Sequence, residues 1–354
     1  MADGARKRPR VIGGLLAGAL LATGIGLYAT DSGPFRDSYC WGAWQENSGA
    51  SFLGDEALAK SGSTRTGSES APPSADRPRG TCTVAVASTV EDDDSDEPLT
   101  FDEQVVVDYG PVPTAAKDRH AWLARYLDGS MTPLPDGLDG LVAGDRAMLV
   151  LPEACDVDGR PSVVTMHGEG WGDGHLGRVT MPFGIGTYSA VTRMLLDVAN
   201  TGMSHAGCAP DQPLRTTSPL VTVAERSELA ATPLCRVPGV RFDFGSDAYY
   251  AQQVGAVTPR LQTCTVAARS RGGSEMPVAQ YVMASTPRMA ALFEGLPEGI
   301  GHGLTRADCD GRATVFYGHV DSSLTADQAV VERSFRNFVA SVGARVGCGT
   351  GGKA

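Results

Sequence analysis

Lysine, aromatic side chains and catalytic consensus motifs are all scarce in this sequence of 354 residues. Only four of its 30 basic residues are lysine, so Schiff-base and lysine-base mechanisms have few candidates. A phosphate-binding loop, a Gly-x-Ser-x-Gly elbow and a Ser-x-x-Lys pair are all missing. Acidic residues outnumber basic ones by 41 to 30, which argues against nucleic acid as a partner. The sequence thus favours a protein without catalytic activity, and it identifies neither a catalytic residue nor a cofactor.

The strongest local signal lies at the N-terminus. Basic residues at positions 6, 7, 8 and 10 precede the uncharged run 11–30, which is long enough to span a bilayer. Because a basic flank stays in the cytoplasm, we expect a cytoplasmic tail at 1–10, a transmembrane anchor at 11–30, a tether at 31–38 and an extracytoplasmic remainder. A cleaved signal peptide is the alternative, although Leu27-Tyr28-Ala29 fits a cleavage site poorly.

Cysteine spacing agrees with an extracytoplasmic location. All eight cysteines follow the uncharged run, none forms a Cys-x-x-Cys metal-binding pair, and the count is even. Disulfides persist outside the cytoplasm. We therefore expect four disulfides among Cys40, Cys82, Cys155, Cys208, Cys235, Cys264, Cys309 and Cys348.

The cysteines also mark an internal repeat. The segment Thr-Cys-Thr-Val-Ala occurs at both 81–85 and 263–267. A Cys-Asp pair followed by Gly-Arg begins at Cys155 and again at Cys309, and Gly-Cys recurs at 207–208 and 347–348. Three matches in the same order predict a tandem duplication, with a first unit at 39–210, a connector at 211–232 and a second unit at 233–349.

Hydrophobic periodicity predicts an α+β fold for each unit. In the first unit we expect a helix over 115–127, and in the second a short helix over 287–293. A closing helix ends each unit, and the second one begins with Thr325 and Gln328 in capping-box register. The Ser- and Pro-containing stretch 61–80 reads as a long loop. The fold class is therefore an antiparallel sheet covered by helices in each unit, with strands at 82–88, 104–109, 147–151 and 162–166, then 263–268, 278–284 and 313–317. The closing helices present apolar faces of Val191, Met194, Leu195, Val198 and Ala199, and of Val331, Phe335, Phe338, Val339 and Val342.

This arrangement predicts how the cysteines pair. A helix that packs back on the preceding strand returns to the point where that strand began, so the cysteine before the strand meets the one after the helix. The remaining cysteines of each unit then pair with each other, and no bridge joins the units. The predicted disulfides are Cys155–Cys208, Cys309–Cys348, Cys40–Cys82 and Cys235–Cys264.

The densest polar cluster is the stretch 167–175, in which two histidines and two carboxylates alternate with glycine. Imidazole and carboxylate groups bind Zn²⁺, so His167, Glu169, Asp173 and His175 form a candidate metal site, although no known ligand spacing is matched. A glycine-rich hairpin tip is the alternative. The second unit keeps one histidine and one acid of this stretch, His319 and Asp321.

Three other groups have structural interpretations. The acidic run 91–97 lacks the spacing of an EF-hand loop and is expected to be a solvated hairpin tip. His120 and His205 fall on predicted helices, which favours solvated or core-edge positions over a general base. The aromatic cluster of Phe35, Tyr39, Trp41 and Trp44 lies either at the membrane interface or around the Cys40 disulfide.

One resemblance accompanies these features. The basic start and single span, with Tyr39-Cys40-Trp41-Gly42-Ala43-Trp44, Ser70-Ala71-Pro72-Pro73 and Thr81-Cys82-Thr83-Val84, resemble uncharacterised membrane-anchored extracytoplasmic proteins of Streptomyces and related actinobacteria. The resemblance implies a single-pass protein of the cell membrane and brings no functional residues.

Three functions are therefore open. The first is a binding or interaction module for an envelope component or a membrane protein. The second is a metal-assisted hydrolase centred on the stretch 167–175, and the third is a structural protein of the cell envelope.

Overall fold

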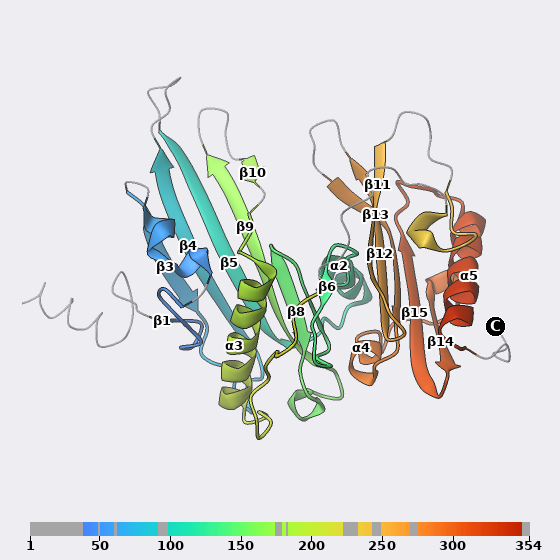
Figure 1. The fold of residues 1–354 in the computed structure, drawn as a ribbon, viewed down its shortest axis with the longest axis horizontal. Coiled ribbons are helices and arrows are strands. Elements are labelled where there is room, and N and C mark those ends of the chain that lie inside the picture. The colour runs from blue at the N-terminus through green and yellow to red at the C-terminus, as the bar shows by residue number, and fades with distance from the viewer. Residues whose placement is uncertain are drawn as a thin grey trace, which may run out of the picture.

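The computed structural model describes residues 38–48, 50–59, 62–90, 98–173, 179–181, 183–221, 233–242, 249–269 and 275–348. It contains two large antiparallel sheets that stand side by side with helices between and outside them (Figure 1). The mixed α+β architecture is thus confirmed. The uncharged run 11–30 and the acidic run 91–97 lie outside the described residues. Within the described part of the chain, no helix is both long and apolar enough to cross a membrane.

The first sheet belongs to the first unit. Its main path runs β3-β4-β5-β9-β8-β7-β6, and the short strand β10 pairs with the far end of β9. All the pairs are antiparallel, and β5 pairs with β9 from end to end. The strands are β3 (Thr64–Glu69), β4 (Gly80–Val90), β5 (Leu99–Pro111), β6 (Thr132–Pro133), β7 (Gly140–Val142), β8 (Arg146–Val150), β9 (Ser162–Asp173) and β10 (Val179–Met181).

The second sheet repeats the strand order of the first. Its path is β11-β12-β13-β15-β14, which matches β3-β4-β5-β9-β8 strand for strand. The first sheet differs by adding β7 and β6 at one edge and β10 on β9. The strands of the second sheet are β11 (Tyr249–Val257), β12 (Leu261–Arg269), β13 (Glu275–Ala284), β14 (Leu304–Cys309) and β15 (Arg312–Val320).

Helices cover both faces of each sheet. The closing helices α3 (Tyr188–Ala206) and α5 (Gln328–Arg345) pack on the two outer faces, while α2 (Ala116–Tyr126) and α4 (Pro287–Ala291) lie between the sheets (Figure 1). The predicted apolar face of α3 is entirely buried. Three of the five positions predicted for α5, namely Phe335, Phe338 and Val342, are also buried. The order of layers is therefore helix, sheet, helices, sheet, helix.

A shared core joins the two units. One cluster of buried side chains combines Leu123 of α2 and the C-cap Leu127 with Val282 of β13 and with Phe293, which follows α4. The side-chain amide of Gln280 on β13 donates to the carbonyl oxygens of Leu123 and Leu127, each at 3.0 Å, and so satisfies the C-terminal end of α2. The central layer consequently belongs to both units at once.

A bidentate ion pair also crosses between the units. Arg288 on α4 places two guanidinium nitrogens 2.7 and 2.6 Å from the two carboxylate oxygens of Asp156. The same guanidinium donates to the carbonyl oxygen of Leu151. Bidentate pairs of this kind fix geometry as well as charge.

All four predicted disulfides are confirmed, and none joins the units. In each unit one bridge ties the opening segment to the second strand of the sheet. The other ties the segment just before β9 or β15 to a cysteine that follows the closing helix, with Cys155 between β8 and β9 and Cys309 at the end of β14. The pairs are Cys40–Cys82, Cys155–Cys208, Cys235–Cys264 and Cys309–Cys348.

Several sequence predictions need correction. The stretch 61–80 is not simply a loop, because it contains β3, which pairs with β4 as the edge of the sheet. Period-two alternation is weak in β3, in β11 and in β14, and all three edge strands were missed. The closing helix of the second unit does not begin at Thr325. Its N-cap is Asp327, whose carboxylate accepts from the backbone N–H groups of Ala329 and Val330.

The aromatic cluster next to Cys40 belongs to the core. Tyr39, Trp41 and Trp44 are buried, and the indole N–H of Trp44 donates to the carbonyl oxygen of Met194 on α3 at 2.9 Å. The packing interpretation is therefore confirmed for these three residues, while Phe35 lies outside the described part of the chain. Short elements complete the structure: β1 (Ser38–Tyr39), β2 (Trp44–Gln45) and 3-10 helices at Ser51–Leu53, Asp55–Leu58, Glu153–Cys155, Leu234–Arg236 and Ile300–His302.

Candidate functional site

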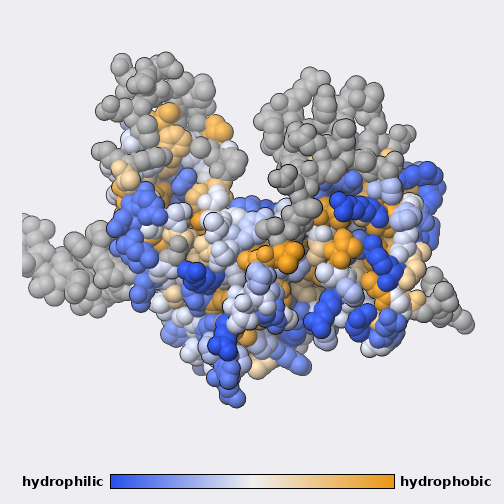
Figure 2. All heavy atoms as spheres, viewed as in Figure 1, coloured by the Kyte–Doolittle hydropathy of each residue, from blue (hydrophilic) through white to orange (hydrophobic). Residues whose placement is uncertain are grey.

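A cleft opens between the two units above helix α2. Three adjoining cavities of about 920, 560 and 430 Å³ share Arg125, which projects from the exposed side of α2. Figure 2 shows polar and apolar residues side by side on the surface where the two halves of the molecule meet. The three cavities meet at Arg125, and we refer to them together as the Arg125 groove. The first unit alone lines two of them, and both units line the cavity of 560 Å³.

The largest part of the groove is a notch in the edge of the first sheet. Strand β8 pairs with β9 only as far as His167, and β10 takes over from Gly170. Between them, the backbone N–H of Gly168 donates to the carbonyl oxygen of Asp145 at 2.7 Å. The notch is therefore open to side chains and ligands, while its backbone at Gly168 is already hydrogen-bonded.

Alternation along β9 explains the glycines of the stretch 167–175. His167, Glu169 and Trp171 point to the inner face of the sheet, and the intervening glycines point to the outer face. A Cβ atom at Gly168 would lie 2.7 Å from the Phe183 ring, so glycine lets the segment after β10 pack closely there. The expected hairpin tip was wrong for residues 167–173, which are strand.

A hydrogen-bonded chain runs below the notch from α2 to β9. The phenol of Tyr126 lies 3.0 Å from Nδ1 of His167, and Nε2 of His167 lies 3.0 Å from a carboxylate oxygen of Glu169. An ionised carboxylate can only accept, so Nε2 carries the proton and Nδ1 accepts from the Tyr126 hydroxyl. Both ring nitrogens of His167 are thereby occupied.

Burial and charge keep this histidine neutral. Desolvation lowers the pKa of His167, the nearby Arg125 guanidinium lowers it further, and the Glu169 carboxylate only partly opposes them. Burial pushes the pKa of Glu169 upward. Hydrogen bonds from Gln104 and His167, together with Arg125, outweigh this and hold the pKa of Glu169 below its usual range. Glu169 is thus a carboxylate, which agrees with the tautomer assigned to His167.

His167 has no free ring nitrogen with which to act as a general base on a ligand. The one basic atom of His167 accepts from Tyr126, whose ring is buried and whose pKa is raised by that burial. Asp108 is also not placed to form a carboxylate pair with Glu169. Asp108 pairs with Thr165 across the sheet, so its backbone lies four residues, or about 13 Å, from Glu169 along the strand direction. Glycosidase carboxyl groups lie about 5–9.5 Å apart.

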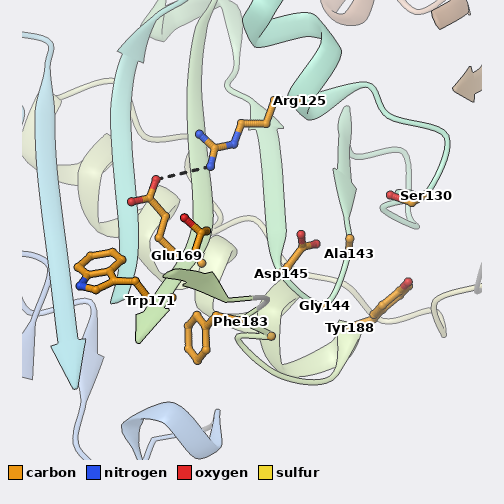
Figure 3. A pocket seen from close by; sticks show the side chains of 13 residues that line it. Arg125, Ser130, Ala143, Gly144, Asp145, Glu169, Trp171, Phe183 and Tyr188 are labelled. Atoms are coloured by element: carbon orange, nitrogen blue, oxygen red, sulfur yellow. Dashed lines mark ion pairs between the residues drawn. The ribbon is translucent and has the colours of Figure 1, made fainter. Parts of the chain in front are cut away.

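Charged groups at the mouth of the groove compensate one another. Arg125 approaches a Glu169 oxygen to 3.7 Å (Figure 3). Arg146 lies 2.7 Å from Asp145 and 3.1 Å from Asp128. The groove therefore has polar donors and acceptors of both signs and no large unbalanced charge.

Aromatic rings border the same notch. The indole N–H of Trp171 donates to Asp102 at 2.9 Å, which orients the ring along the inner face of β9. Trp171, Phe183 and Tyr188 line the notch together with Asp145 (Figure 3), Trp171 from the inner face of β9 and Phe183 from the outer face. Phe183 is supported from behind by Phe52, at a ring separation of 5.4 Å.

The second unit contributes an uncharged wall to the groove. Ala251, Gln253, Thr265, Ala267 and Pro277 line this side, and none of them carries a charge. Their small side chains leave room across the cleft from Arg125.

A second aromatic contact lies at the other end of α2. His120 lies 2.8 Å from the Tyr317 hydroxyl, and its ring stacks on that of His319 at 5.5 Å. His319 occupies the same place in β15 as His167 does in β9, because each follows the Gly of an Asp-Gly turn by eight residues. Helix α2 thus contacts the equivalent strand of both sheets.

The structure brings together only part of the candidate metal set. His167 and Glu169 are in contact, whereas the side chain of Asp173 and all of His175 lie outside the described residues. Among the residues that the structure describes, no group of three or more histidine, cysteine, aspartate or glutamate side chains could hold a metal ion. His205 lies at the end of α3, and His120 on α2, as predicted.

Sequence reasoning missed Arg125, Tyr126 and Gln104, the partners of the His167–Glu169 pair. The strict alternation of glycine with larger residues from His167 to Asp173 was a usable signal, since it predicts a strand and places His167, Glu169 and Trp171 on one face. Comparisons of this chain with known protein families, with curated proteins and with solved structures find no match.

Proposed function

We propose that this protein is a membrane-anchored extracytoplasmic binding module without catalytic activity, and that its ligand occupies the Arg125 groove. The observation that carries the proposal is the union of three cavities around Arg125. The largest of them is at the upper end of the range of roughly 300–1,000 Å³ that is typical of ligand sites. The groove is rigidly built, because its floor α2 belongs to the core shared by both units.

The chemistry of the groove supports binding over catalysis. His167 has no ring nitrogen left for a substrate, and Tyr126 of α2 is buried. Exposed groups such as Arg125 and Glu169 can donate and accept hydrogen bonds without changing protonation state. The metal-assisted hydrolase gains no further support among the described residues.

The resemblance to Streptomyces proteins suggests an envelope component as the ligand, with residues 11–30 as the membrane anchor. The binding test is co-sedimentation of the purified full-length chain, in a mild detergent, with washed Streptomyces cell walls. We expect saturable binding that Arg125→Glu abolishes, because the substitution places a second acid against Glu169. Arg333→Glu, at an exposed position on the outer side of α5, is the matched control and should bind like the parent chain.

Two results would contradict the proposal: no binding by the parent chain, or equal loss of binding in both variants. Orientation is tested separately with protease added to intact cells. Degradation of everything beyond about residue 31 is expected, and protection of that part would exclude the proposed topology.

We further propose that the two units arose by tandem duplication. The shared strand order and the equivalent disulfides support this. So does the backbone: both units have two successive non-glycine residues with positive φ at the opening cysteine, Cys40-Trp41 and Cys235-Arg236. Such conformations are rare for these residue types, and finding them at equivalent sites favours a common ancestor.

A further inference from the structure

We propose that the ligand of the Arg125 groove is a saccharide chain of uncharged pyranose units. This inference rests on the proposed function and names its ligand class. A pyranose has apolar C–H faces and a rim of hydroxyl groups. A site for it needs flat aromatic surfaces next to acceptors and donors that carry little net charge, and the notch of the first sheet supplies both.

The aromatic part of the site is preorganised. Trp171 is fixed by its hydrogen bond to Asp102, and Phe183 is fixed by its contact with Phe52. Both rings line the same cavity as Tyr188. Because these rings are already ordered, they lose little side-chain freedom when a ligand binds. Losing such freedom would otherwise reduce the affinity for the ligand.

The polar part of the site has unused hydrogen-bonding capacity. Glu169 accepts from His167 with one oxygen and from Gln104 with the other, yet its side chain is 40% exposed and each oxygen can accept a second bond. Arg125 is 44% exposed and contributes several N–H donors. A carboxylate and a guanidinium side by side match the hydroxyl and ring oxygens of a sugar.

The same features disfavour other ligand classes. Glu169 and Asp145 would repel a phosphate polymer, and Arg125 and Arg146 would repel an oligocation. The groove therefore offers neither ligand an electrostatic potential of a single favourable sign. A peptide adding to the sheet edge would need free backbone groups, but the N–H of Gly168 already bonds Asp145. Sugars need neither a free strand edge nor a net charge.

Isothermal titration of the full-length chain with defined tetramers tests the inference. The saccharide probes are tetramers of β-1,4-linked glucose, N-acetylglucosamine and mannose and of α-1,4-linked glucose, and the counter-probes are tetralysine and polyphosphate. The detergent must not be a glycoside, because a sugar headgroup would compete. We expect at least one tetramer to bind, and to bind more tightly than its monomer, because the groove extends over three cavities.

Substitutions then locate the binding. Trp171→Ala should weaken the tetramer by about tenfold, the loss expected of one aromatic stacking contact, and Trp171→Phe by less. Arg333→Ala is the control and should bind unchanged, and thermal unfolding of each variant verifies that it is folded.

Four outcomes overturn the inference. If no tetramer binds although the chain still sediments with cell walls through Arg125, the ligand is not a saccharide and the proposed function stands. Binding of tetralysine or polyphosphate alone has the same meaning. A tetramer that binds Trp171→Ala and the parent chain equally well lies outside the notch, and failure of every probe and of the cell walls removes both proposals.

Discussion

The two units have the same scaffold but present different surfaces to the cleft between them. Five strands in the same order, two disulfides in the same places and a closing helix recur in both. The first unit presents Glu169, Trp171 and Arg125 to the cleft, whereas the second presents alanine, threonine, glutamine and proline side chains. Backbone pairing and core packing determine the repeated scaffold, and exposed side chains are free to diverge on it. We infer that binding specificity resides in the first unit and that the second provides a neutral wall.

The equivalent histidines show the same divergence at one position. His167 is buried and bonds Tyr126, whereas His319 is exposed and stacks on His120. Helix α2, which belongs to the first unit, contacts both. The asymmetry therefore follows from the longer α2, since its counterpart α4 has five residues and α2 has 11.

The prediction with the largest expected effect on stability tests whether the two units unfold together. Replacing Cys155 and Cys208, or Cys309 and Cys348, with alanine opens loops with separations of 53 and 39 residues. Each change should lower the free energy of unfolding by about 4 kcal/mol. Because the units share a core, we expect one transition in every variant.

Urea unfolding distinguishes the two possibilities. All four tryptophans lie in the first unit, and only Trp122 packs against the shared core, so their fluorescence reports chiefly on the first unit, whereas far-ultraviolet circular dichroism reports on both. In the Cys309/Cys348 variant the two signals should shift together. A fluorescence transition that stays at its parental midpoint would show that the units are independent.

Arg288→Ala is expected to have the next largest effect, because it removes the ion pair between the units. The substitution leaves Asp156, which is only 17% exposed, without its bidentate partner and should cost about 2–3 kcal/mol. Arg306→Ala is the matched control, since its pair with Glu298 is more exposed and is worth roughly 0–1 kcal/mol. Equal effects of the two substitutions in urea unfolding would mean that Arg288 does not couple the units.

The next prediction has a smaller expected effect and concerns one buried tyrosine hydroxyl in each unit. Tyr126→Phe leaves Nδ1 of His167 without a donor, and Tyr281→Phe leaves Ser334 without its partner at 2.8 Å. An unsatisfied buried acceptor costs about 1–3 kcal/mol, whereas a serine hydroxyl can rotate toward another partner. We therefore expect Tyr126→Phe to lower the free energy of unfolding more than Tyr281→Phe, and the reverse order would contradict the account of the His167 chain.

The sequence predicted the scaffold better than the groove. The apolar periodicity of α3 was sufficient to predict the closing helix, because it is a local pattern. The disulfides followed from the cysteine positions once each closing helix was assumed to pack back on the preceding strand. The edge strand β3 carries exposed polar residues on both faces, and β14 has only six residues with two exposed charges among them, so neither pattern indicated a strand. The groove was not predictable, because Arg125 and Glu169 meet only after α2 folds across β9, and no local pattern contains that contact.

The last prediction concerns pH and separates the two equivalent histidines. Burial lowers the pKa of both His167 and His319 below the ordinary 6.5. As the pH falls below about 6.5, the unfolded chain takes up protons before the folded chain does, so stability declines from that pH downward and is constant with respect to these groups above it. The decline is gradual, and His167→Gln should reduce it more than His319→Gln, because His167 is buried beside Arg125 whereas His319 is only partly covered and keeps part of its surface in solvent. Urea midpoints measured from pH 8 to pH 5 give the two slopes, and an unchanged slope in His167→Gln would show that this histidine does not titrate as a buried neutral group.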